Sequence, residues 1–344
     1  LHRGCIPTKA LLRTSNLLDD VRKAESFGVD VSEPALNMER THLYKDAVVE
    51  KNARGVEYLL KKNKVEGIRG RGKLTGPNEV EVTSDEGTST YRAKHILLAT
   101  GSVPRDIPPA PTDGERILNS DHMLQVKDVP GKLLVVGSGA VGCEFASVFA
   151  SFGSEVTLVE MLPRILPLED EEISKELARV FRKRGITSLT GTQLQGVERT
   201  EGGLRVSLAK GDETQTAEAD MVLIAVGRAP VTGDLGLEAL GIGLDRGYVE
   251  VNEYMQTAVP HIYAIGDIVK TPWLAHVASA EGILAVEHMA GEEARPLNYD
   301  HVPSVTYCEP EVGSVGLSEA EAEEVGYDVA VGKFPFSALG KAAV

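Results

Sequence analysis

One stretch places the tightest constraint on the fold of this chain: Leu133 to Glu160, with the sequence LLVVGSGAVGCEFASVFASFGSEVTLVE. A short apolar run is followed by Gly137, Gly139 and Gly142, then by a segment with helical apolar spacing and by a second apolar run. This order is typical of a strand, a glycine turn, a helix and a parallel strand that bind a dinucleotide. The glycines would allow a tight turn, a close approach of the backbone to a pyrophosphate, and close helix packing.

The helix and the acid that follow sharpen this interpretation. Apolar residues at helical spacing are expected to form one buried face, and Gly153 is expected to end the helix. Glu160 stands at the end of the second strand, where a carboxylate can accept hydrogen bonds from both ribose hydroxyls of NAD and would repel the extra phosphate of NADP. The alternative is a glycine-bearing structural crossover without a ligand. The residues of the expected buried face are Val141, Phe145, Val148, Phe149 and Phe152.

Composition limits the possible classes of protein. A chain of 344 residues is long enough for two or three domains, and 42% hydrophobic residues with 35 glycines fit an α/β protein. The formal net charge of −15 argues against nucleic acid as a partner. No apolar run approaches the roughly 20 residues of a membrane helix. The three cysteines are too few and too scattered for a secreted disulfide framework, so we expect a cytoplasmic protein; they are Cys5, Cys143 and Cys308.

The first residues combine a cysteine with a helix start. Pro7 suits the first turn of a helix, and leucines continue a helical period as far as Val21. Cys5 would therefore lie just outside a helix N-terminus with Lys9 one turn in, and both features favour the reactive thiolate. A lone cysteine is usually a small buried residue in a turn. Gly4, Pro7 and Lys9 favour the reactive interpretation here.

The segment GCIPTKALL resembles the redox-active segment of the pyridine nucleotide–disulfide oxidoreductases, in which two cysteines are spaced C-x-x-x-x-C. By that resemblance Cys5 is the second cysteine, which faces the flavin and forms the charge-transfer thiolate, and Lys9 lies beside the flavin ring. Glu144 corresponds to the buried partner of Lys9. The first cysteine would immediately precede Leu1, so we expect the sequence to be part of a longer protein.

Four further motifs of the same family follow in order. Ala99–Ser102 resembles the A-T-G segment at the exit from the FAD domain, and Gly227-Arg228 resembles the V-G-R-x-P that closes the NAD domain. Thr257–Asp267 resembles the second FAD motif, whose aspartate holds the ribityl group; the alternative is an aspartate that caps a strand. Trp273–His276 resembles an M-L-A-H that touches the flavin. His276 could equally be a helix-capping or core histidine, and it is assigned no acid–base role.

The resemblance assigns the cofactor contacts residue by residue, and it implies no metal. The predicted FAD contacts are Lys9, Gly72, Thr100, Gly101, Ser102, Gly266, Asp267, Trp273, Leu274, Ala275 and His276. The predicted NAD contacts are Gly137, Gly139, Ala140, Val141, Gly142, Glu144, Glu160, Leu194 and Gly227. The predicted catalytic residues are Cys5, Lys9 and Glu144.

The expected fold is α/β, with two Rossmann-like dinucleotide-binding domains and the start of an α+β dimerisation domain. The expected parts are an FAD-binding domain over 1–130, an NAD-binding domain over 131–250, a return to the FAD domain over 251–300, and the dimerisation segment over 301–344. Residues 303–319 resemble the opening of that last domain, with Cys308 in place of the usual Thr; Cys308 and Cys143 are interpreted as small packing residues.

The local patterns predict several further elements. Residues 39–63 and 170–184 are expected to be helices, the second with Ile173, Leu177 and Val180 inward. Residues 65–99 are expected to hold a small antiparallel sheet. Residues 104–131 are expected to cross between domains, because they hold prolines and no long apolar period.

The resemblance implies a flavoprotein reaction in which protein-bound dihydrolipoamide is oxidised and NAD is reduced to NADH through a redox-active disulfide. Ile6 and the triplet Leu274-Ala275-His276 favour the dihydrolipoyl dehydrogenase branch, and Glu160 disfavours the NADP-dependent glutathione and mercuric reductases. The implied partners are a second copy of the chain and the lipoyl domain of a 2-oxo acid dehydrogenase acyltransferase, or the glycine cleavage carrier protein. Alternatives are another disulfide reductase or a non-catalytic flavoprotein.

The family's general base is a His-Glu pair near the C-terminus, contributed across the dimer, and the sequence ends before it. The first cysteine and part of the FAD site would likewise lie outside the sequence. Residues 1–344 alone are therefore expected to be inactive, and dithiol–NAD turnover by this segment would contradict the interpretation.

Overall fold

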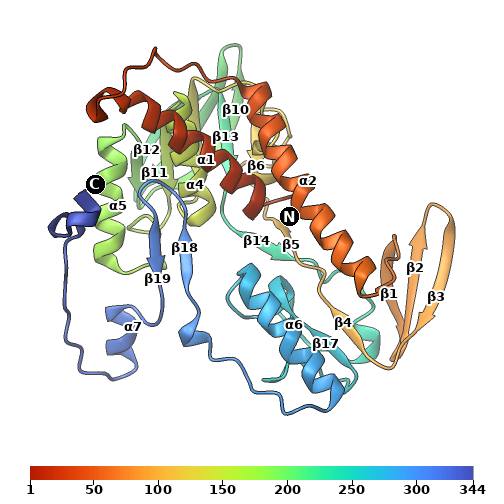
Figure 1. Cartoon of the computed structure of the whole chain (residues 1–344). Helices are drawn as coiled ribbons and strands as arrows, with labels where there is room; N and C mark the ends of the chain where they lie inside the picture. The colour runs from red at the N-terminus through yellow and green to blue at the C-terminus, as the bar shows by residue number, and fades with distance from the viewer. Residues whose placement is uncertain (344) are drawn as a thin grey trace.

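A computed structural model describes residues 1–343. Two long helices open the chain, α1 (Cys5–Arg22) and α2 (Met38–Lys62), and α1 packs against both α2 and the later helix α4 (Ala140–Phe152) (Figure 1). The buried leucines of α1 join the same hydrophobic cluster as the phenylalanines of α4. The first segment of the chain is thereby fixed to the dinucleotide-binding unit predicted from the sequence.

That unit is a five-stranded parallel sheet with the strand order β6-β13-β7-β8-β9. Side chains alternate along its strands because successive residues of a strand point to opposite faces. Leu133 and Val135 pack toward α4 and α5 (Glu171–Lys183), whereas Leu134 and Val136 pack toward a second sheet. The parallel strands are β6 (Ile117–Asn119), β7 (Lys132–Val136), β8 (Glu155–Glu160), β9 (Thr187–Thr190) and β13 (Met221–Ile224).

The second sheet is antiparallel and consists of β10 (Gln193–Thr200), β11 (Gly203–Lys210) and β12 (Glu213–Ala219). Its buried residues Leu204, Val206 and Leu208 cover the face of the parallel sheet that the helices leave open. The parallel sheet is therefore buried on both faces, as its continuous apolar strands require. This arrangement confirms the predicted α/β fold.

Two details of helix burial differ from the prediction. Val141 is 38% exposed, because it lies in the first turn of α4, where the helix faces a cavity instead of the core. In α5, Ile173 is 45% exposed and the buried stripe runs through Ser174, Leu177 and Phe181. Ser174 can be buried there because its hydroxyl donates to Leu166 O at 3.1 Å.

The predicted small antiparallel sheet is present as β1 (Arg71–Gly76), β2 (Glu79–Ser84) and β3 (Gly87–Arg92). Next to it, β4 (Ile96–Leu98) pairs in parallel with β17 (Ile262–Ala264), and Leu74 of β1 packs on this pair. The helix α6 (Ala275–Ala290) follows β17 (Figure 1). Two segments that resemble FAD motifs are therefore neighbours in the fold.

The predicted crossing contains structure that its sequence did not indicate. β6 and the short helix α3 (Ser120–Met123) lie within residues 104–131, and β6 pairs with β13 in the parallel sheet. That sheet therefore begins before residue 131, and the predicted domain limits do not coincide with it. β5 (Ser102–Pro104) pairs with β14 (Arg228–Pro230), so the chain enters and leaves the unit side by side.

The last segment forms a hairpin of β18 (Ser304–Thr306) and β19 (Val312–Ser314), followed by α7 (Glu319–Glu324). β18 packs against α4. A two-residue ladder, β15 (Leu244–Asp245) with β16 (Tyr248–Val249), completes the strands of the described residues. Within residues 1–343, no helix is both long enough and apolar enough to cross a membrane.

Candidate functional site

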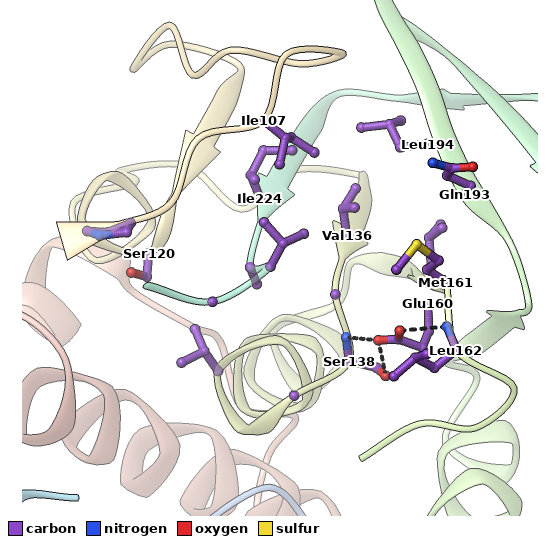
Figure 2. Close-up of a pocket in the computed structure, with 18 of the residues that line it drawn as sticks. Ile107, Ser120, Val136, Ser138, Glu160, Met161, Leu162, Gln193, Leu194 and Ile224 are labelled. Atoms are coloured by element: carbon purple, nitrogen blue, oxygen red, sulfur yellow. Dashed lines mark hydrogen bonds between the residues drawn. The ribbon is translucent and has the colours of Figure 1, made fainter. Parts of the chain in front are cut away.

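A cavity of about 590 Å³ opens at the carboxyl ends of the parallel strands (Figure 2). Its floor includes Val136, Glu160 and Ile224, which end or closely follow β7, β8 and β13. Ligands of doubly wound parallel sheets bind at this edge, near the point where the strand order reverses. The order β6-β13-β7-β8 reverses at β7, directly beneath the glycine turn. The cavity therefore lies where the sequence predicts a dinucleotide.

The three glycines of the turn perform different tasks. A Cβ on Gly137 would stand 2.4 Å from Ala225 O, and one on Gly142 would stand 1.9 Å from Gly137 O. No atom lies within 4 Å of a Cβ built on Gly139, which lines the cavity. The first and third glycines thus allow close backbone packing, whereas the second leaves room beside the helix N-terminus, where anions are favoured. The turn fits a pyrophosphate.

Glu160 is 8% exposed, and both of its carboxylate oxygens are held by protein donors. Oε2 accepts from the backbone N of Ser138 at 2.8 Å and from its Oγ at 2.7 Å, and Oε1 accepts from Leu162 N at 2.8 Å. Figure 2 shows these bonds fixing the carboxylate beside the cavity. Oε1 keeps acceptor capacity for one further donor, such as a ribose hydroxyl.

The predicted partnership of Lys9 and Glu144 is present. Lys9 Nζ donates to Glu144 Oε1 at 2.8 Å and to Oε2 at 2.9 Å. Glu144 is 4% exposed, and its Oε1 also accepts from Tyr307 N at 3.0 Å. Lys9 Nζ lies 4.7 Å from the centroid of the Tyr307 ring. One carboxylate thus joins α1, α4 and the strand region that contains β18.

Cys5 is the first residue of α1 and not a residue outside it, because Gly4 takes the N-cap position with a φ of 115°. The cysteine is exposed and lies one turn before Lys9 on the same helix face. The other two thiols are fully buried, and burial raises the pKa of Cys143 well above its usual value and that of Cys308 to about 12. Cys143 and Cys308 are therefore packing residues, as predicted.

The structure brings Ser102 and Asp267 together from distant parts of the chain. The Ser102 hydroxyl donates to the Asp267 carboxylate, and Arg228 donates from Nε to Ser102 Oγ at 2.7 Å and from Nη2 to Ser102 O at 2.6 Å. Because Arg228 donates to that hydroxyl, the hydroxyl proton is directed at Asp267. Arg228 also lines the cavity. It therefore touches both predicted cofactor sites.

The remaining predicted FAD residues contact several different segments of the chain. Thr100 Oγ1 donates to Val231 O at 2.6 Å, and Gly101 has a φ of 72° in the turn beside it. Trp273 Nε1 donates to Val269 O at 3.3 Å. His276 lies in the first turn of α6, and its Nε2 is 3.0 Å from Pro303 O; its contact with FAD stays a prediction. Leu274 and Ala275 begin that helix, and Gly72 lies in β1 opposite Val82.

The cavity includes most of the predicted NAD contacts but not all of them. Gly142 and Glu144 lie outside its lining, since Gly142 packs under the turn and Glu144 faces Lys9. The sequence interpretation missed other lining residues because they come from separate segments whose shared feature is their place near the strand ends. They include Ile107, Pro108, Pro109, Ser138, Met161, Leu162, Gln193 and Arg228. Only the position of Arg228 next to Gly227 offered a signal.

Several curated relatives cover the whole chain. A protein of Bacillus subtilis called dihydrolipoyl dehydrogenase is 42% identical over 355 residues, which are 100% of this chain and 75% of that protein. A Thermus scotoductus protein of the same name is 44% identical over 99% of this chain and 73% of its own length. The mitochondrial protein of that name from Pisum sativum is 39% identical over 99% of this chain and 69% of its own length.

Solved structures agree with the fold. LpdA from Mycobacterium tuberculosis superposes with a TM-score of 0.88 at 30% identity, over 95% of this chain and 71% of that one. The Escherichia coli flavoprotein disulfide reductase RclA superposes with a TM-score of 0.83 at 27% identity, over 99% of this chain and 73% of that one. The family described as pyridine nucleotide-disulphide oxidoreductase matches residues 1–282, and its dimerisation domain matches residues 302–344. The chain therefore belongs to the pyridine nucleotide-disulphide oxidoreductase family.

Proposed function

We propose that the protein to which this chain belongs oxidises dihydrolipoamide and reduces NAD to NADH, the activity that the name of its relatives, dihydrolipoyl dehydrogenase, describes. The observation that carries the proposal is the double use of α4. Its first turn lines the nucleotide cavity, and its Glu144 holds Lys9, one turn from Cys5. The helix that carries the exposed Cys5 thiol is thus fixed to the helix that lines the nucleotide cavity, which suits transfer of electrons from a dithiol to NAD.

FAD and NAD are the cofactors of this family, and the residues present fit both. Asp267 offers a carboxylate held by Ser102, which suits the hydroxyls of a ribityl chain. Gly139 and Glu160 offer an open turn and a fixed acceptor, which suit the pyrophosphate and ribose of NAD. Bound FAD would supply the two-electron transfer between the thiol pair and NAD.

The chain's own residues would act as follows. Cys5 and the cysteine that the motif places immediately before Leu1 form a disulfide, and a dihydrolipoamide thiolate attacks it. Exchange transfers two electrons and two protons in all: the substrate thiols pass their protons to a base or to solvent as they attack, and the two enzyme sulfurs regain two protons as they leave. The substrate therefore departs as a disulfide and the enzyme holds a dithiol. Glu144 accepts two hydrogen bonds from Lys9 Nζ and so holds this side chain one helical turn from Cys5. The Tyr307 ring covers the Lys9 ammonium on one side.

The match of residues 302–344 to the family's dimerisation domain supports a homodimer. The lipoyl group would arrive on the lipoyl domain of a 2-oxo acid dehydrogenase acyltransferase, or on the glycine cleavage carrier protein. A cytoplasmic location belongs to the same proposal. Binding of an isolated lipoyl domain to the homodimer, measured by surface plasmon resonance, tests the partner.

The proposed reaction predicts a simple assay result. The natural full-length protein, supplied with dihydrolipoamide, should form NADH with NAD at a kcat/KM about 100-fold above that with NADP, because Glu160 repels the extra phosphate. Absorbance at 340 nm follows the reaction. Equal rates with both nucleotides would contradict the role of Glu160, and no turnover by a flavin-loaded protein would contradict the lipoyl substrate.

Replacing Glu160 with Gln should weaken NAD binding about 10- to 100-fold. Both carboxylate oxygens accept from N–H groups, so the amide nitrogen of Gln must face a donor on one side. The dissociation constant of NADH, measured by fluorescence, checks this. Glu155→Gln is the matched control, because Glu155 is exposed at the other end of β8 and should leave the constant unchanged. A Glu160→Gln protein with normal NADH affinity would refute the assignment.

A further inference from the structure

Three glutamates are buried among residues 1–343, and two of them, Glu144 and Glu160, belong to the site described above. The third is Glu281, which is 0% exposed in the second turn of α6. Burying a carboxylate is costly unless donors or a cation compensate its charge. The contacts of Glu281 should therefore indicate what this charge does.

Glu281 is held by two neutral donors from different segments. Its Oε2 accepts from Gly266 N at 2.7 Å, and its Oε1 accepts from the Tyr299 hydroxyl at 3.1 Å. None of the ion pairs formed by the described residues includes Glu281. An apolar residue would fill the same space at lower electrostatic cost. The Glu281 carboxylate is therefore better explained by the positions in which it holds its two donors than by a contribution to the stability of the fold.

The geometry concerns the turn that carries Asp267. Gly266 has a left-handed φ of 70°, and a Cβ there would stand 3.3 Å from the Cβ of Ala278. The turn is fixed on one side because Ile265 N donates to Leu98 O at 3.0 Å. It is closed on the other because Val269 N donates to Gly266 O at 2.9 Å. Glu281 holds the amide between these points, immediately before Asp267.

Tyr299 connects this turn to the last segment of the chain. It begins the 3₁₀ turn Tyr299–His301, which directly precedes the residues that match the dimerisation domain. Burial and the neighbouring Glu281 carboxylate raise the pKa of Tyr299, so its phenol stays protonated and keeps donating. A shift of this segment would remove the hydrogen bond from Tyr299 to Glu281. The Glu281 carboxylate would then be less firmly placed to accept from Gly266 N.

We propose that Glu281 is a positioning residue for the flavin, because its carboxylate fixes the Gly266–Asp267 turn by accepting from Gly266 N. Since Tyr299 donates to the same carboxylate, the position of the turn also depends on the segment that leads into the dimerisation domain. The inference rests on the proposed function, because that function assigns Asp267 to the flavin. It makes FAD affinity sensitive to two residues that would not touch FAD.

The test measures FAD binding to the full-length apoprotein by flavin fluorescence. Glu281→Leu should raise the dissociation constant of FAD about 10- to 100-fold, because Gly266 N and the Tyr299 hydroxyl lose their acceptor. Tyr299→Phe should raise it about 5-fold. Glu281→Gln should restore near-normal affinity, since the amide can accept from Gly266 N and donate to the Tyr299 oxygen. Glu287→Leu, on the exposed side of α6, is the matched control.

Two further measurements separate the possible outcomes. If Glu281→Leu lowers the melting temperature of the apoprotein but the folded variant binds FAD normally, Glu281 is structural and the inference is wrong. Asp267→Ala tests the proposed function: unchanged FAD affinity in that variant would overturn the flavin site itself. Weakened binding in Asp267→Ala with normal binding in Glu281→Leu would overturn only the role of Glu281.

Discussion

Replacing Cys5 with Ser should lower the turnover of dihydrolipoamide with NAD at least about 10³-fold. The serine hydroxyl cannot form a disulfide, and it is a poor nucleophile without a dedicated base. Cys5 is the exposed thiol of the described residues, whereas burial raises the pKa of Cys143 and Cys308 and keeps them protonated. Neither of these can therefore replace Cys5. NADH formation at saturating substrate measures the loss.

The same variant should keep its nucleotide sites, which provides the internal control. Cys5 is absent from the lining of the cavity, and its side chain is exposed. Oxidation of NADH by an artificial acceptor that takes electrons directly from the flavin should stay within about 3-fold of normal. Cys308→Thr, which introduces the residue usual at this position in the family, should retain dithiol turnover. Substantial dithiol turnover by Cys5→Ser would exclude the disulfide mechanism.

The sequence was sufficient to predict those parts of the site that lie close together along the chain. The glycine turn, the helix that follows it and Glu160 fall within a single βαβ unit, so spacing alone indicates which atoms face a ligand. Lys9 and Glu144 are far apart in the sequence, and only the family resemblance linked them. Their bidentate contact agrees with that link.

Other parts of the site could not be predicted, because they depend on which segments the fold brings together. Ser102 meets Asp267 and Arg228 only once β5 pairs with β14 and β4 pairs with β17. β6 is three residues long, too short for any periodic signal, so its place in the parallel sheet was missed. Ile173 was expected to face the core because it is apolar. In the structure Ile173 is exposed and Ser174 is buried instead, with its hydroxyl donating to Leu166 O.

The buried acid Glu281 illustrates a third kind of limit. A glutamate in the middle of a helix ordinarily lies on a solvated face, and nothing in the neighbouring sequence marks this one as buried. Its two donors come from before and after α6 and are neutral, so no charge pattern pairs them with it. Such a positioning residue leaves little trace in a single sequence, because its partners are a backbone amide and a neutral hydroxyl far from it along the chain.

Alanine substitutions at Gly142 and Gly139, two glycines of the same turn, should have different effects on stability and on NADH binding. Gly142→Ala should abolish measurable NADH binding and lower the free energy of unfolding by about 3 kcal/mol or more. Its Cβ would stand 1.9 Å from Gly137 O, and this obstacle is backbone that supports both β7 and α4. No side-chain rotation can relieve the clash. The helix must move away from the sheet, which displaces the turn that lines the cavity.

Gly139→Ala should instead damage the binding site alone. The φ of Gly139 is −67°, which alanine adopts without strain, and a Cβ there meets no protein atom within 4 Å. Its methyl group would occupy the space left for the pyrophosphate, so the dissociation constant of NADH should rise about 100-fold while the melting temperature stays within about 1 °C. Differential scanning calorimetry and NADH fluorescence separate the two variants. If Gly139→Ala bound NADH normally, the nucleotide could not lie against this turn, whatever Gly142→Ala did to the fold.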